Sequence, residues 1–133
     1  MDLWQLRGSS WKLAHSLNLE GATTGITFSA EGRLVAIAGG KSPRSGVLAD
    51  LETGALTDLR GTPFTHVAFS PDGRTLATAA DKKVSLWQAA SGRYLAELEG
   101  GGMGNVLLLH FSADGHALVH GSYPALHLWR TEK

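Results

Sequence analysis

The chain has 133 residues, no net charge, 43% apolar residues and no cysteine. This composition excludes a disordered chain, the broad basic surface of a nucleic-acid binder, and any disulfide or thiolate site. Because no apolar run reaches the ~18 residues of a membrane span or forms a signal peptide, we expect a cytoplasmic protein of one domain, residues 1–133, without membrane or nucleic-acid partners.

The first segment, residues 1–21, reads as two strands. Leu3-Trp4-Gln5 resembles Leu86-Trp87-Gln88 further along the chain, and the run from Trp11 to Leu19 resembles the strand that ends in Leu98-Glu99-Gly100. Helix-period patterns of ten or more residues are absent, and most of the 17 glycines fall between short apolar runs. The sequence therefore predicts an all-β protein that opens on the third and fourth strands of a repeat.

The second segment, residues 22–61, introduces a motif that recurs. Phe28-Ser29-Ala30-Glu31-Gly32 returns as Phe69-Ser70-Pro71-Asp72-Gly73 and as Phe111-Ser112-Ala113-Asp114-Gly115, with the phenylalanines 41 and then 42 residues apart. A period near 40 residues with several short strands is typical of a propeller, in which four-stranded sheets stack side by side to bury their faces.

This first repeat also carries an irregular loop over residues 39–46. It holds three extra residues and two basic side chains, Lys41 and Arg44, which makes it the best candidate for a contact peculiar to this protein. The favoured interpretation is still an insertion that is merely tolerated.

The third segment, residues 62–103, is the clearest repeat. Strands are predicted over Thr65–Ser70, Arg74–Ala79, Val84–Trp87 and Tyr94–Leu98, with Pro71-Asp72-Gly73 as the hairpin turn. Four strands in about 40 residues leave no room for crossover helices, so the sheet is expected to be an antiparallel meander.

The last segment, residues 104–133, keeps the same spacing. Phe69 to Trp87 is 18 residues, and Phe111 to Trp129 is also 18. Only three strands are predicted here, the last ending at Leu128-Trp129-Arg130, so a fourth strand is missing.

The Phe-Ser-Pro-Asp-Gly hairpin and the Leu-Trp ending of the third strand resemble WD-repeat β-propeller blades, in their degenerate bacterial form. The resemblance covers essentially the whole chain and is strongest over residues 62–100. It implies a structural clasp of Trp87 with Thr78 and Asp81, and the same position for Trp129 in the last repeat. The Gly-His pair of that family is absent from every repeat, so the clasp is expected to be incomplete.

Three blades are too few for a ring, since propellers typically have four to eight. We therefore expect a head-to-tail homo-oligomer that closes one ring, as a dimer of six blades or a trimer of nine. The completing strand would come from another molecule, through these residues: Trp11, Leu13, Leu17 and Leu19 of the first segment, against Leu126 and Leu128 of the last. The other interpretation is a piece of a larger propeller, natural or engineered.

Candidate chemistry is sparse, and we expect no catalytic residue, cofactor or metal. His116 and His120 would lie ~13 Å apart on one strand, too far to share an ion, and His120 with His127 lacks a third ligand. The repeated Ser29, Ser70 and Ser112 are expected to bond turn backbone.

The favoured hypothesis is a non-catalytic scaffold that assembles a propeller and binds a protein ligand. A second is a structural or engineered piece whose only activity is self-assembly, and a minor third is an enzyme with a site at subunit junctions.

Overall fold

The computed structural model describes residues 2–16, 21–39, 44–60, 64–99, 105–122 and 125–130. Those residues form strands and turns and no helix, so the predicted all-β class is confirmed. The strands are β1 (Asp2–Arg7), β2 (Ser10–Ser16), β3 (Thr23–Phe28), β4 (Leu34–Gly39), β5 (Arg44–Asp50), β6 (Leu56–Arg60), β7 (His66–Phe69), β8 (Thr75–Ala80), β9 (Lys83–Gln88), β10 (Arg93–Glu99), β11 (Val106–Phe111), β12 (Ala117–Ser122) and β13 (Ala125–Arg130).

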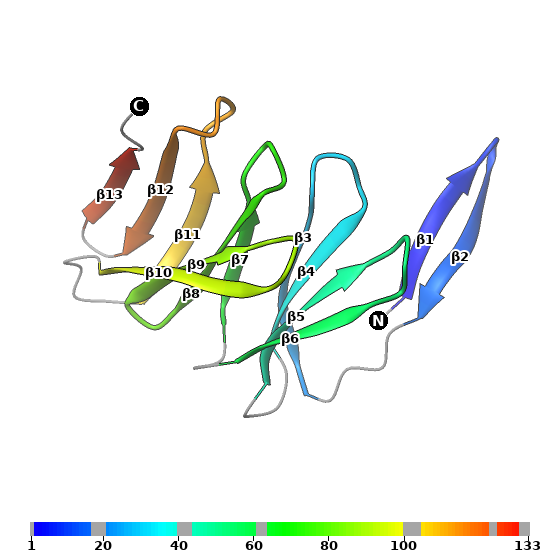
Figure 1. Ribbon diagram of the computed structural model, residues 1–133, viewed down its shortest axis with the longest axis horizontal. Helices are drawn as coiled ribbons and strands as arrows, with labels where there is room; N and C mark the ends of the chain where they lie inside the picture. The colour runs from blue at the N-terminus through cyan, green and yellow to red at the C-terminus, as the bar shows by residue number, and fades with distance from the viewer. Residues whose placement is uncertain are drawn as a thin grey trace.

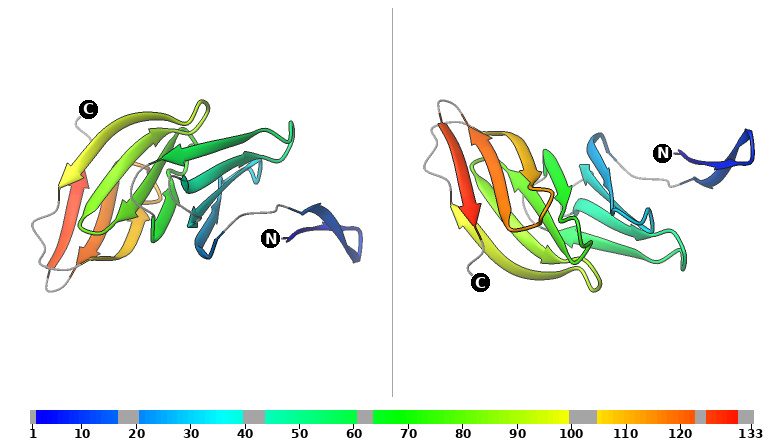
Figure 2. Two further views of the ribbon diagram at one scale, coloured as in Figure 1. Left: turned by 90° about the horizontal axis from the view of Figure 1, so that it is seen from below. Right: turned by 90° about the horizontal axis from the view of Figure 1, so that it is seen from above.

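Three antiparallel sheets follow one another in chain order (Figure 1). Sheet I holds β3–β6, sheet II holds β7–β10, and sheet III holds β11–β13, each as a meander in which consecutive strands pair. The four strands predicted in residues 62–103 are confirmed, and each end lies within one residue of its expected place. The hairpin β1–β2 is a separate two-stranded unit (Figure 2).

The turn between the first two strands closes in the same way in every sheet. The Ser29, Ser70 and Ser112 hydroxyls each accept a bond from a backbone N–H five residues later, at 3.0 Å. In sheets II and III the same hydroxyl also donates to the carboxylate two residues on, at 2.6 Å, and this bond lowers the pKa of Asp72 and Asp114. The predicted role of the three serines in turn bonding is confirmed.

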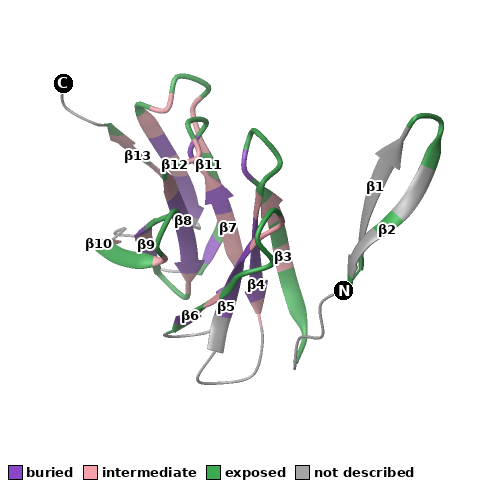
Figure 3. Cartoon of the chain, turned by 45° about the vertical axis from the view of Figure 1, so that its right-hand side comes forward, coloured by how far each residue is buried: buried purple, intermediate pink, exposed green. Residues whose placement is uncertain are grey.

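The sheets pack face to face around two apolar clusters, with the first strands β3, β7 and β11 lying next to one another. The junction between sheets I and II buries Ala36, Ala38, Leu48, Leu59, Phe64, Leu76 and Trp87. The junction between sheets II and III buries Ala68, Ala77, Ala79, Val84, Val106, Leu109 and Leu118. Because alternate residues of a strand point to opposite faces, β8 contributes Leu76 to one junction and Ala77 to the other. Figure 3 shows that β8 is buried along most of its length.

The hairpin β1–β2 has the register of a third and fourth strand. Trp4 pairs with Leu13 and the register then shifts, just as Trp87 of β9 pairs with Tyr94 of β10 before a shift. Arg7 and Ser10 meet at the turn end of the hairpin. The N-terminal strands therefore repeat the outer half of sheet II.

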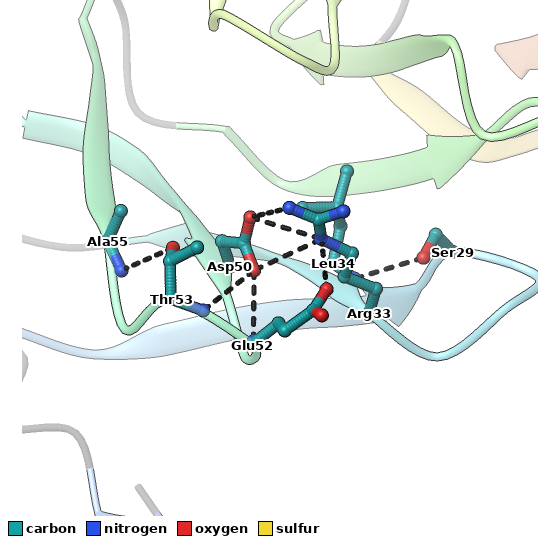
Figure 4. A network of polar contacts seen from close by, with 7 residues as sticks. All are labelled: Ser29, Arg33, Leu34, Asp50, Glu52, Thr53 and Ala55. Carbon is teal, nitrogen blue, oxygen red and sulfur yellow. Dashed lines mark hydrogen bonds and ion pairs between the residues drawn. The ribbon is translucent and has the colours of Figure 1, made fainter.

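Sheet I has a polar network beside the position where the other sheets carry tryptophan (Figure 4). The Arg33 guanidinium bonds Asp50 at 2.9 Å and contacts Glu52 at 3.2 Å, and Asp50 Oδ1 accepts from the Glu52 and Thr53 backbone N–H groups. The bond from Arg33 is the main cause that lowers the pKa of Asp50 to about 2. This network fixes the turn after β5 and lies on the surface.

Candidate protein-binding surface

Exposed apolar side chains gather on the two outer faces of the stack. On the face of sheet III that points away from sheet II, Leu107, Leu126 and Leu128 are 66%, 70% and 54% exposed. On the face of sheet I that points away from sheet II, Ile26, Phe28 and Leu56 are 47%, 50% and 55% exposed. The middle of that second face is covered, because Val35, Ile37 and Ala49 form a buried cluster there.

These two faces are the two halves of one type of junction. Leu128 lies 42 residues after Leu86, which packs against the core between sheets II and III, and Leu48 of sheet I is only 5% exposed in the equivalent place. Phe28 likewise corresponds to Phe69, which packs against the core between sheets I and II. Some positions that are covered where sheets meet inside the chain, such as those of Leu128 and Phe28, are thus exposed at its two ends, whereas Val35, Ile37 and Ala49 are buried at the outer face of sheet I as well.

The last strand of sheet III has an open edge. In sheets I and II the third strand is followed by β6 or β10, whereas within the described ranges β13 pairs with β12 alone. Unpaired N–H and C=O groups on such an edge are a template for strand addition. Leu126 and Leu128, both predicted to take part in strand completion, lie on this strand.

The predicted completing strand is only partly described. Trp11 and Leu13 lie on β2, and Leu13 is 51% exposed, while Leu17 and Leu19 lie outside the described residues. The structure pairs β2 with β1 of the same chain, as expected for the third and fourth strands of one meander, a pairing that the sequence analysis did not weigh against completion of the last strand.

An apolar groove runs between sheets II and III beside the open edge. It has a volume of about 470 Å³, and its apolar lining includes Leu86, Leu98, Phe111, Leu118 and Trp129. In the junction between sheets I and II, the ring of Tyr94 on the fourth strand packs edge-on against Trp87 with centroids 5.5 Å apart. Sheet III has no such strand among the described residues to pack on Trp129.

Two of the residues predicted for the clasp are in contact. The Trp87 indole Nε1–H donates to Thr78 Oγ1 at 2.9 Å, and Thr78 is fully buried. The third residue, Asp81, sits in the following turn with a positive φ of 52°, and its backbone carbonyl accepts a bond from Val106 N–H at 2.8 Å. Among the bonds of the described residues, none joins the Asp81 carboxylate to Thr78 or Trp87.

Sheet III replaces this bond with a stack of rings. His120 and Trp129 lie 42 residues after Thr78 and Trp87, so a histidine stands where sheet II has a threonine. The His120 ring stacks on His127 with centroids 4.9 Å apart and on Trp129 at 6.3 Å. Within the described part of the chain, both His120 nitrogens and Trp129 Nε1 are buried without a hydrogen-bond partner.

This environment lowers the pKa of His120, first through burial and then through the neighbouring His127. The sequence interpretation placed His120 and His127 across one hairpin but missed the exchange of threonine for histidine. The spacing of 18 and 42 residues already contained that signal.

The bounds of the irregular loop differ from the prediction, while its contact role stays a prediction. Arg44 begins strand β5 and pairs with Arg60 of β6, so the irregular loop is shorter than residues 39–46, and Lys41 lies outside the described residues. Across the described ranges, no group of three His, Cys, Asp or Glu side chains could hold a metal ion. No helix in the same ranges is long and apolar enough to cross a membrane.

Comparisons with known proteins identify the repeat. Residues 55–88, from the end of the turn before β6 to the end of β9, match the family described as "WD domain, G-beta repeat". A stretch of 49 residues is 47% identical to WD repeat-containing protein SL1-17 of Schistosoma mansoni, which covers 35% of this chain and 16% of that protein.

Solved structures show the same fold. The chain resembles the structure titled "Crystal structure of RRP9 WD40 repeats", with a TM-score of 0.70, 20% sequence identity, and coverage of 88% of this chain and 37% of that one. "Structure of U3-55K" gives a TM-score of 0.71, also at 20% identity, and covers 88% of this chain and 38% of that one. The chain thus spans well under half the length of these relatives.

Proposed function

Because residues 55–88 match the WD40 repeat and the fold resembles WD40 structures, we propose that the chain is a non-catalytic protein-interaction scaffold that assembles head to tail into a closed propeller. Two copies would give six blades, and three would give nine. Heterologous contacts of this kind close into a ring when the rotation per subunit divides the circle.

The complementarity of the two outer faces carries the proposal. On the first face, Leu126 and Leu128 lie where sheet II presents Val84 and Leu86 to sheet III. On the second face, Ile26 and Phe28 lie where sheet II presents Val67 and Phe69 to sheet I. Contact between the first face of one copy and the second face of another would therefore repeat the junction already present twice in the chain. Exposed apolar surface of this extent is typical of an interaction site.

A second source of the same junction is a longer polypeptide that supplies further repeats. The relatives favour this reading too, since the chain covers 16% of the curated one and 37% of a solved one. The two sources differ in what the 133-residue chain does by itself.

Light scattering on the purified chain tests the proposal. We expect a mass of two or three times 14.1 kDa, and a compact monomer at high concentration would contradict assembly and favour further repeats of a longer chain. Leu128→Glu should shift the protein to monomer, because it places a charge in the new junction. Leu95→Glu is the matched control, since Leu95 is 44% exposed on β10 and lies on neither outer face.

The loops at the ends of the strands are the proposed platform for a protein ligand. This part rests on the fold, whose members serve many functions, and on the absence of a catalytic arrangement among the described residues. A pull-down with the assembled ring as bait tests it, with the Leu128→Glu monomer as the control for a ligand that needs the closed ring.

A further inference from the structure

β1 is one strand more than the repeats need. The matched WD40 stretch takes in β6, β7, β8 and β9, so the sequence repeat begins on a fourth strand and ends on the third strand of the next sheet. Counted in that order, β2–β5, β6–β9 and β10–β13 are three consecutive sets of four strands. β1 stands outside all three sets.

β1 and β13 offer the same kind of edge to a fourth strand. Leu3-Trp4 on β1 matches Leu128-Trp129 on β13, and both match Leu86-Trp87 on β9. The register of β1 with β2 reproduces that of β9 with β10, including the shift between the leucine and the tryptophan. The same register applied to β13 places Leu13 opposite Trp129 and Lys12 opposite Arg130.

Leu13 also has the right position for the groove beside Trp129. On β10 the residue opposite the tryptophan is Tyr94, whose ring packs on Trp87. Leu13 is its counterpart on β2, and 51% of its surface is exposed in the β1–β2 hairpin. Tyr94 stays 50% exposed in the complete sheet II, so moving β2 to β13 would place Leu13 next to Trp129, beside the groove of about 470 Å³, without burying it fully.

We propose that β1 covers the edge of β2 in the single chain and that β13 of a second copy displaces β1 when the chains assemble. This inference rests on the head-to-tail assembly proposed above. The exchange replaces one strand pair with another, so main-chain bonding is nearly balanced and the burial of the outer faces drives the reaction. β1 thereby acts as a built-in competitor that sets the concentration at which assembly begins.

A reversible lock on the hairpin tests the exchange. Gln5 and Lys12 are paired residues of β1 and β2, at a separation suited to a disulfide, and the chain has no native cysteine to interfere. The double variant Gln5→Cys, Lys12→Cys should stay monomeric when oxidised and assemble after reduction, as measured by light scattering. The matched control is Gln88→Cys with Arg93→Cys, the equivalent pair of β9 and β10, which should assemble in both states.

Each outcome separates the exchange from the assembly itself. Assembly of the oxidised lock to the same extent as the reduced form overturns the exchange alone, because β2 would then use its other edge. A chain that stays monomeric in both states overturns the head-to-tail assembly and the exchange with it.

A second pair of variants needs no disulfide. Gln5→Pro removes one backbone hydrogen bond between β1 and β2. Because losing such a bond weakens the pairing roughly tenfold, the concentration of half-assembly should fall by about the same factor. Lys12→Pro damages β2 itself and should prevent assembly. If Gln5→Pro instead weakens assembly, β1 belongs to the interface and the competitor role is wrong.

Discussion

Sheets II and III are built on the same spacing and differ in what surrounds them. Each has a Phe-Ser-x-Asp-Gly turn and a tryptophan 18 residues after the phenylalanine. Sheet II has four strands, both faces covered and the Trp87 N–H bonded to Thr78, whereas sheet III has three strands, one open face and a Trp129 N–H without an acceptor among the described residues. The comparison separates what a repeat encodes locally from what it takes from its neighbours.

The largest difference is expected for core truncation. Leu76→Ala removes a fully buried side chain between two complete sheets and should cost about 2–5 kcal/mol of unfolding free energy, measured by urea denaturation. Leu118→Ala is the same change 42 residues later, at 4% exposure, beside the open groove. It should cost less, because surroundings that lack a fourth strand can relax into the space.

Equal losses at Leu76 and Leu118 would contradict the comparison, since sheet III would then be as tightly held as sheet II. Both variants should be measured in the monomeric Leu128→Glu protein, so that assembly does not cover the groove beside Leu118.

Breaking the bond between Trp87 and Thr78 should cause the next largest loss of stability. Thr78→Val keeps the shape of the side chain but leaves the buried Trp87 N–H without its acceptor, which should cost about 1–3 kcal/mol. Urea denaturation followed by tryptophan fluorescence measures it. If Thr78→Val costs no more than an exposed substitution that removes no hydrogen bond, such as Thr23→Val, packing alone holds Trp87.

His120 should make the stability of sheet III depend on pH. Its pKa lies below the usual 6.5 in the folded chain, so between those two values the unfolded chain binds more protons. Stability should therefore be full above about pH 6.5 and fall as the pH is lowered. Unfolding midpoints in urea at pH 7 and pH 5 measure the loss.

His120→Thr is the matched variant, because it gives sheet III the residue that sheet II has at this place. It should provide an acceptor for Trp129 Nε1 and reduce the loss between pH 7 and pH 5. An unchanged pH profile would assign the acid sensitivity to another of the six histidines.

The parts of this fold that local sequence determines were predictable. Strand ends of sheet II fell within one residue because Ser70, Asp72 and Gly73 fix the turn by their own bonds and by a positive φ. The stack of His120 on His127 depends on the register between β12 and β13, which a histidine in one strand does not predict.

The candidate surface was predictable in kind and less so in detail. Repeat counting indicated open faces and a missing strand beside Leu126 and Leu128. It did not reveal that β2 is held by β1, because the Leu3-Trp4 and Leu128-Trp129 edges are alike and sequence alone does not rank them. Arg44 was assigned to a loop because Gly and Ser around it resemble turn residues, although it pairs with β6.

The smallest loss of stability is expected from removing the turn serines, and it should be equal in sheets II and III. Ser70→Ala and Ser112→Ala each remove a bond accepted from backbone N–H at 3.0 Å and a bond donated to an aspartate at 2.6 Å, and each should cost about 0.5–1.5 kcal/mol. Both partners of every bond lie within one turn, so the neighbouring sheet has no part in it. Urea denaturation of the two variants on the Leu128→Glu background measures the pair. A clearly larger loss at Ser70 would mean that the adjoining sheets stiffen even this turn, and the boundary between local and neighbour-dependent structure would then lie inside the motif itself.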